Sequence, residues 1–185
     1  MPRTFEVSDS IVVRVPPEEV YRHVSDPARM GEWSPENLGG TVTSGPGEIR
    51  TGTVFDGRNK RGAFRWTTRC TVTAAEPGRL FRFRVHAIGV RSPRIRGPIA
   101  TWEYRFEPVP EGTRVTETWT DDRRAWPDAV AGVFDRIATR GHTFAAFQRR
   151  NIATTLRNLK RVLERAGETG QATTGQETTG RETTD

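Results

Sequence analysis

Bulky side chains on alternate positions are the feature of this chain that most restricts its fold. They fall in four short stretches: Phe64/Trp66, Phe81/Phe83, Trp102/Tyr104/Phe106 and, more weakly, Val115/Glu117/Trp119. Period-two alternation is typical of β-strands with one buried and one solvent-facing side. A long segment with helical periodicity follows the last of these strands. One wide aromatic sheet face covered by one long helix favours a hollow interior, and we expect that hollow to bind a small apolar molecule.

Glycine and proline divide the rest of the chain into further strands. The pattern predicts strands at 5–15, 40–44, 51–59, 63–75, 79–88, 98–108 and 112–121, with residues 58–62 as a hairpin connection. Pro17, followed by Glu18 and Glu19, predicts a short helix directly after the first strand, because proline and acidic residues suit a helix N-terminus. A second short helical turn is expected from Ala28 to Trp33.

The long helix is predicted to begin at Trp126-Pro127-Asp128 and to end at Ala166-Gly167. A straight helix of this length exceeds what a small domain needs, so a kink or break is expected near Gly132 or Gly141. Residues 167–185 repeat Thr, Gly, Gln and Glu without a large apolar side chain, which predicts a disordered tail. The sequence thus predicts one folded domain, residues 1–166, followed by that tail.

The 185 residues carry a net charge of +6, with Lys60 and Lys160 as the two lysines among 29 basic residues. The arginines are dispersed over the outward side of strands, so we expect no nucleic-acid partner. The first residues lack the apolar core of a secretory signal, and no run reaches the length of a bilayer span, so we expect a cytoplasmic protein without stable membrane insertion. With one cysteine and three scattered histidines, no metal site or cofactor is predicted.

The order of elements and several local motifs resemble the START-like superfamily, also called SRPBCC or polyketide cyclase/dehydrase-like. The motifs are Pro16-Pro17-Glu18-Glu19-Val20, Asp26-Pro27 with Trp33-Ser34-Pro35-Glu36, Gly52-x-x-Phe55-x-Gly57-x-Asn59, Arg65-Trp66 with Cys70-x-Val72, Glu76-Pro77-Gly78, and Thr154, Leu156, Leu159 and Lys160. The resemblance covers residues 5–166. It implies an α+β helix-grip fold, in which a seven-stranded antiparallel sheet curls around the C-terminal helix, and two short helices follow strand 1. It also implies a cavity for apolar ligands between sheet and helix.

The phase of each strand then selects most of the candidate ligand-binding residues: Phe55, Asn59, Trp66, Thr68, Phe83, Trp102, Tyr104, Glu117 and Trp119. Phe134 and Ile137 join them from the long helix, and Trp33, where the short helices meet the sheet, is either a cavity wall or a plug that closes one end. Glu117 is the best candidate for a catalytic residue, and Tyr104 the next. A buried carboxylate must be paired or must have its pKa raised. Glu117 therefore either acts in acid–base chemistry or binds a ligand hydroxyl, or it forms a salt bridge to an arginine of the long helix such as Arg136 or Arg140, unless a bulge turns it outward. Cys70 shares the buried phase, which favours a core residue over a nucleophile.

Two further features allow a functional and a purely structural interpretation. Asn59 either contacts a ligand at the cavity mouth or caps the adjacent hairpin. The loop from Gly89 to Pro98, with Arg91, Arg94 and Arg96, is either a rim that attracts an anionic group or a solvated basic loop. The first functional hypothesis is a binding module for a hydrophobic or aromatic molecule. The alternative is a polyketide cyclase/aromatase or dehydratase-type enzyme that uses the same cavity, and a weaker third is a partner-binding role.

Overall fold

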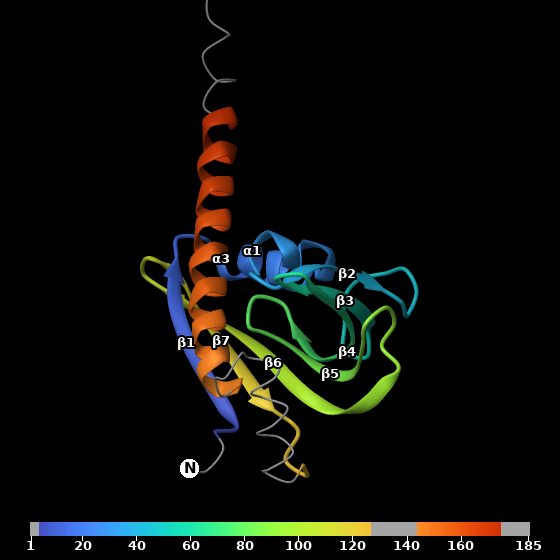
Figure 1. Ribbon diagram of the computed structural model, residues 1–185. Helices are drawn as coiled ribbons and strands as arrows, with labels where there is room; N and C mark the ends of the chain where they lie inside the picture. Colours follow the sequence, from blue (N-terminus) through green and yellow to red (C-terminus); the bar gives the residue numbers. More distant parts are fainter. Residues whose placement is uncertain (1–3, 127–143, 175–185) are drawn as a thin grey trace, which may run out of the picture.

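The fold is a curled sheet of seven antiparallel strands with one long helix against it, as the computed structural model shows in Figure 1; the model describes residues 4–126 and 144–174. In chain order the elements are β1 (Glu6–Val13), α1 (Pro17–Val24), η1 (Pro27–Glu32), β2 (Asn37–Val42), β3 (Val54–Arg61), β4 (Phe64–Glu76), β5 (Leu80–Gly89), β6 (Ile95–Val109), β7 (Gly112–Asp121) and α3 (Phe144–Thr174). The predicted α+β helix-grip fold is confirmed, with α1 and the 3₁₀ helix η1 as the two short helices.

The strands follow one another as a meander from β2 to β7, and β1 then pairs with β7 at the far edge. The order across the sheet is β1-β7-β6-β5-β4-β3-β2. Directly opposed residues share a face in an antiparallel ladder. Trp102 lies opposite Trp119, and Tyr104 lies opposite Glu117, so the bulky side chains of β6 and β7 stand together on the concave face.

The two short helices close one end of that concave face. Pro17 occupies the first turn of α1 and Asp26 caps η1, where its carboxylate accepts a 2.9 Å hydrogen bond from the backbone N–H of Ala28. Tyr21 of α1 packs edge-on against Phe81 and Phe106 of the sheet, with ring centroids 6.4 and 6.0 Å apart. These contacts hold α1 over the sheet end, so solvent is excluded from that side.

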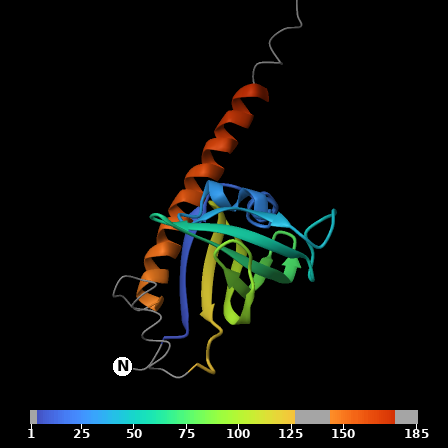
Figure 2. The same ribbon diagram turned by 45° about the vertical axis from the view of Figure 1, so that its right-hand side comes forward.

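Helix α3 lies along β1 and its C-terminal end extends beyond the sheet, as Figures 1 and 2 both show. Its packing face is apolar and fully buried: Ile152, Leu156, Leu159 and Leu163. Polar contacts fix the position of α3 along β1. Lys160 Nζ donates a 2.8 Å hydrogen bond to the Val12 carbonyl, and the Arg14 backbone N–H donates a 3.0 Å hydrogen bond to Glu164. No helix among the described residues is long and apolar enough to cross a membrane.

Helix α3 does not stop at Ala166-Gly167 as expected but continues through Gly167 to Thr174. Helix α3 contains Gly167 and Gly170, and each glycine lowers helix stability by about 1 kcal/mol, so neither ends the helix by itself. The division into a domain of residues 1–166 and a disordered tail stays a prediction. The predicted helix start at Trp126 and the kink at Gly132 or Gly141 lie wholly or partly outside the described residues.

The β3–β4 hairpin is tighter than the sequence predicted. Residues 58–62 were expected to form the connection, but β3 runs on to Arg61, which pairs with Phe64 across a two-residue turn. Gly62, with φ of +60°, supplies the left-handed backbone that this turn needs. Phe64, expected to point inward, is 59% exposed and stacks on Trp66 instead.

Candidate functional site

A cavity of about 160 Å³ lies between the concave face of the sheet, η1 and the first turns of α3. All ten candidate ligand-binding residues within the described part of the chain line it: Trp33, Phe55, Asn59, Trp66, Thr68, Phe83, Trp102, Tyr104, Glu117 and Trp119. Phe134 and Ile137, the other two, lie outside the described residues. Eight of the lining residues are aromatic, and the rings of Phe55 and Phe83 meet edge-on with centroids 5.3 Å apart. The described candidates therefore lie around one cavity, as expected. Their role in ligand binding stays a prediction.

Glu117 is buried in this wall, with 1% of its surface exposed. It lies opposite Tyr104 in the β6–β7 ladder, and the Tyr104 hydroxyl donates a 2.8 Å hydrogen bond to Glu117 Oε1. Burial raises the pKa of Glu117 to about 8, although the hydrogen bond from Tyr104 opposes that rise. Burial also raises the pKa of Tyr104 well above its ordinary value. The carboxyl group is therefore mostly neutral at pH 7.

Two structural alternatives were considered for Glu117, a bulge that turns it outward and a salt bridge to a helix arginine. A bulge that turns the side chain outward is wrong, because Glu117 is buried and its strand pairs in regular register. The residues considered for a salt bridge, Arg136 and Arg140, lie outside the described residues. Glu117 Oε2 has no hydrogen-bond partner among the described residues. Tyr104 thus holds one oxygen of the carboxyl group of this cavity-lining residue, while the other oxygen is buried and unpartnered in the described part of the chain.

Trp33, which lines the same cavity, has a second polar atom without a partner among the described residues. It follows η1 directly, is 2% exposed, and packs edge-on to Tyr104 with ring centroids 5.8 Å apart. Its Nε1–H finds no acceptor, and it and Glu117 Oε2 are the two buried side-chain nitrogen or oxygen atoms of the described chain that lack a partner. The Asn158 side chain of α3 donates a 3.1 Å hydrogen bond to the Trp33 carbonyl. Trp33 is therefore a fixed part of the cavity wall.

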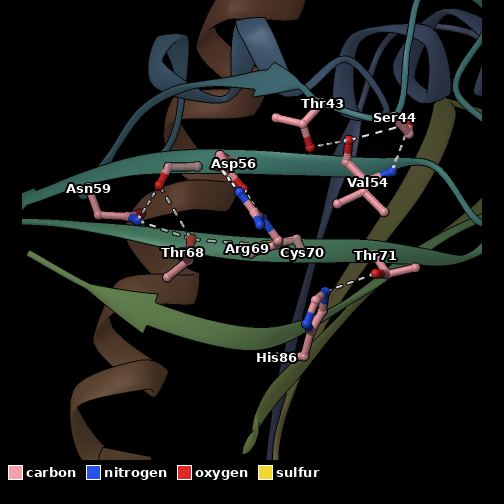
Figure 3. Close-up of polar contacts among 11 residues, drawn as sticks. Thr43, Ser44, Val54, Asp56, Asn59, Thr68, Arg69, Cys70, Thr71 and His86 are labelled. Atoms are coloured by element: carbon pink, nitrogen blue, oxygen red, sulfur yellow. Dashed lines mark hydrogen bonds and ion pairs between the residues drawn. The ribbon is translucent and has the colours of Figure 1, made fainter. Parts of the chain in front are cut away.

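Asn59 does not cap the hairpin, because it lies inside β3 opposite Trp66. Figure 3 shows its side chain beside Thr68 of β4: its amide donates to the Gly57 carbonyl at 3.1 Å and to Thr68 Oγ1 at 3.3 Å. Asn37 of β2 in turn donates to Asn59 Oδ1 at 3.4 Å. These bonds link three strands at one side of the cavity and hold the Asn59 amide in place.

Arg61 is a cavity residue that the sequence did not indicate, because it was assigned to a turn. It forms an ion pair with Glu36, and its guanidinium lies 4.0 Å from the ring centre of Phe147 on α3 and 5.5 Å from that of Trp66. The contacts join the β3–β4 hairpin, the start of β2 and α3. Arg61 therefore ties the helix to the hairpin at one side of the cavity.

Helix α3 contributes polar residues to the lining that were also missed. They are Gln148, Asn151 and Thr155, and the first and last of them are nearly fully buried. Their spacing of three and four residues matches that of the apolar residues beside them, which is the signal that could have found them. A periodic pattern of apolar side chains does not include polar residues, so it does not reveal a helix face that carries both kinds.

Other titratable groups are accounted for by local contacts. Cys70 is buried and burial raises the pKa of its thiol to about 12, which supports its assignment as a core residue. His86 bonds to Thr71 on the convex side (Figure 3), and His23 bonds to Glu32 beside η1. Within the described ranges no group of three His, Cys, Asp or Glu side chains could hold a metal ion.

Comparisons with known proteins agree with this geometry. The family model described as polyketide cyclase / dehydrase and lipid transport matches residues 4–164. The chain is similar to the solution structure of the Polyketide_cyc-like protein Cgl2372 from Corynebacterium glutamicum, at 30% identity and a TM-score of 0.53, over 89% of this chain and 94% of that one. A comparison with curated protein sequences finds no significant match.

Two more distant structures share the fold. Protein NE0264 from Nitrosomonas europaea is 14% identical, with a TM-score of 0.62 over 89% of this chain and 97% of that one. The di-domain ARO/CYC StfQ from the steffimycin biosynthetic pathway is 17% identical, with a TM-score of 0.60 over 88% of this chain and 52% of that one. At these identities the likeness concerns the fold.

Proposed function

The chain belongs to the polyketide cyclase/dehydrase and lipid transport family, and from that premise we propose that it binds a small hydrophobic or aromatic molecule that carries a hydrogen-bonding oxygen. The observation that carries the proposal is that two residues lining one cavity, Trp33 and Glu117, each have a buried polar atom, Nε1 and Oε2, without a partner among the described residues. A buried polar atom without a partner costs about 1–3 kcal/mol, and such atoms are rare in folded proteins. A ligand oxygen would remove that cost.

The chemistry of the two atoms limits the ligand. The indole N–H of Trp33 can only donate, so the ligand must present an acceptor there. Neutral Glu117 already accepts from Tyr104 through Oε1, so its other oxygen is free to carry the proton and donate as well. A phenol or a ring ketone meets these demands. The volume of about 160 Å³ suits one ring, since an apolar cavity of about 150 Å³ takes up benzene.

The test is a titration of the ¹⁵N-labelled protein with phenol and with toluene, which have nearly the same shape. We expect saturable binding of both, tighter binding of phenol, and a phenol-specific shift of the Trp33 indole N–H signal, which a Trp33→Phe variant assigns. The indole signal of Trp126, which does not line the cavity, is the internal control. Absence of saturable shifts with either compound would refute the proposal.

A second candidate function, a cyclase/aromatase or dehydratase-type enzyme, is favoured by the state of Glu117. A neutral carboxylic acid that is hydrogen-bonded to Tyr104 can donate its proton to a carbonyl oxygen of the substrate, and the resulting carboxylate can take a proton back from carbon. Tyr104 would stabilise that carboxylate by its hydrogen bond. Proton donation makes the carbonyl carbon more electrophilic, and the cavity would hold the reacting chain in a folded conformation.

Proton exchange separates the two functions. Acetophenone exchanges the hydrogens next to its carbonyl slowly in D₂O, so catalysed exchange reports an acid–base group in the cavity. The enzyme hypothesis expects the protein to accelerate this exchange and expects Glu117→Gln to abolish the acceleration. Binding of acetophenone without acceleration would leave the binding function and refute the enzymatic one.

A further inference from the structure

The hairpin that joins β5 to β6 carries two strongly exposed aliphatic side chains. Val90 is 66% exposed and Ile95 is 70% exposed, which exceeds every other large apolar side chain of the described residues. Single exposed apolar residues are ordinary on protein surfaces. Here, however, two of them flank the same turn. Neither side chain packs into the core, so both are available to contact another surface.

The same hairpin is basic and its arginines are not neutralised. Arg91, Arg94 and Arg96 are exposed, and the sequence contains no Asp or Glu from residue 77 to residue 102. Arginines of β5, by contrast, form ion pairs: Arg82 with Glu103, and Arg84 with Asp122. The three hairpin arginines form no ion pair with a carboxylate in the described part of the chain. The hairpin is thus complementary to a negatively charged surface.

The exposed apolar residues are continuous with the cavity. Ile88 lies opposite Ile95 in the β5–β6 ladder, so their side chains share a face of the sheet. Ile88 lines the cavity, and so does Ile99 on the neighbouring strand. An apolar strip therefore leads from the cavity wall to the exposed turn. A surface in contact with the turn would lie beside the cavity.

The turn itself is closely packed. A Cβ atom on Gly89 would lie 1.9 Å from the Ser92 carbonyl oxygen, so only glycine fits. The Ser92 carbonyl accepts from the Arg94 backbone N–H at 3.0 Å, and the Ser92 hydroxyl accepts from Arg94 Nε at 3.2 Å. The hairpin is therefore preformed, and binding through it costs little ordering entropy.

We propose that residues 88–96 dock this protein on an anionic lipid surface. Val90 and Ile95 enter the boundary between headgroups and acyl chains, while Arg91, Arg94 and Arg96 contact lipid phosphates. Single-stranded nucleic acid is a weaker match, since residues 87–101 contain no Phe, Tyr or Trp on which bases could stack. Docking does not depend on the proposed function; if the cavity binds an apolar ligand, docking brings it next to the phase in which such ligands dissolve.

The test is co-sedimentation of the full chain with two kinds of vesicle: phosphatidylcholine alone, and phosphatidylcholine mixed with phosphatidylglycerol. We expect binding to the mixed vesicles only. The variant Arg91→Gln/Arg94→Gln/Arg96→Gln should bind more weakly by about fivefold for each arginine replaced, and Val90→Ser/Ile95→Ser should also lose binding. The matched control Arg50→Gln/Arg79→Gln/Arg150→Gln removes the same charge from exposed sites outside the hairpin and should retain most of it.

Equal loss in the control and in the hairpin variant would refute the proposal, because general charge would then explain binding. Binding to neither vesicle, or hairpin-dependent binding to poly-uridine but not to vesicles, would also refute it. Phenol binding in the absence of lipid, measured on the same variants, is expected to be unchanged. Loss of vesicle binding together with intact phenol binding would therefore separate a failure at the hairpin from a failure at the cavity.

Discussion

The hydroxyl of Tyr104 donates a 2.8 Å hydrogen bond to Glu117 Oε1 across the β6–β7 ladder, and both side chains are buried in the cavity wall. This bond satisfies one oxygen of a carboxyl group that has no salt-bridge partner in the described residues. It leaves the other oxygen buried and without a partner among the described residues. The same pair determines how the protein should respond to pH.

The stability of the protein should fall as the pH rises from about 4.5 to about 8. The pKa of Glu117 is about 8 in the folded state and near 4.5 in the unfolded state, so between these values the folded protein holds more protons. The stabilisation is complete below the unfolded pKa and is lost as the pH rises through the folded pKa, by on the order of 5 kcal/mol in total. Urea denaturation from pH 5 to pH 8.5 measures it.

Glu117→Gln is the control for that experiment, because glutamine keeps the shape and does not titrate. The variant should lose most of the downward slope over the same pH range. Parallel slopes in the wild type and in Glu117→Gln would show that the pH dependence comes from other groups.

Tyr104→Phe should destabilise the protein by about 1–3 kcal/mol, because it leaves both oxygens of a buried carboxyl group without a partner. In a Glu117→Leu background the same substitution should cost much less, since the acceptor is gone. The double-mutant cycle, measured by urea denaturation at pH 6, gives the coupling energy. An equal cost in both backgrounds would contradict a direct interaction.

Leu159→Ala should destabilise the protein by about 3 kcal/mol, since this side chain is fully buried between α3 and the body of the domain. Arg157→Ala, two residues earlier on the exposed side of the helix, should change stability by less than about 0.5 kcal/mol. Thermal denaturation compares the two. Similar losses would mean that α3 is not held by its apolar face.

Gly112→Ala should destabilise the protein by more than about 2 kcal/mol. Its φ is +134°, and an added Cβ would lie 2.2 Å from the Val13 carbonyl oxygen, where backbone cannot yield easily. Gly97→Ala is the matched control, because its backbone is not left-handed and nothing lies within 4 Å of the added atom. Similar unfolding midpoints for both variants would refute this account of the β6–β7 turn.

The sequence by itself determined the fold and the inner wall of the cavity. Alternation along a strand is a local property, and a buried face keeps the same phase for as long as the strand pairs in regular register. That reasoning identified Trp66, Phe83, Tyr104, Glu117 and Trp119 as lining residues. It was wrong for Phe64, which is 59% exposed, because strand phase does not reveal which end of a strand is covered by other elements.

Only the tertiary structure decided which polar groups find partners. Arg61 reaches Glu36 across strands and Phe147 on a helix, contacts between residues 25 and 86 positions apart that no local pattern encodes. Glu117 and Trp33 were both expected to face inward, but their lack of a partner depends on every side chain that surrounds them. Periodicity fixes direction, whereas the volume of a cavity and the hydrogen bonds within it depend on distances between elements far apart in sequence.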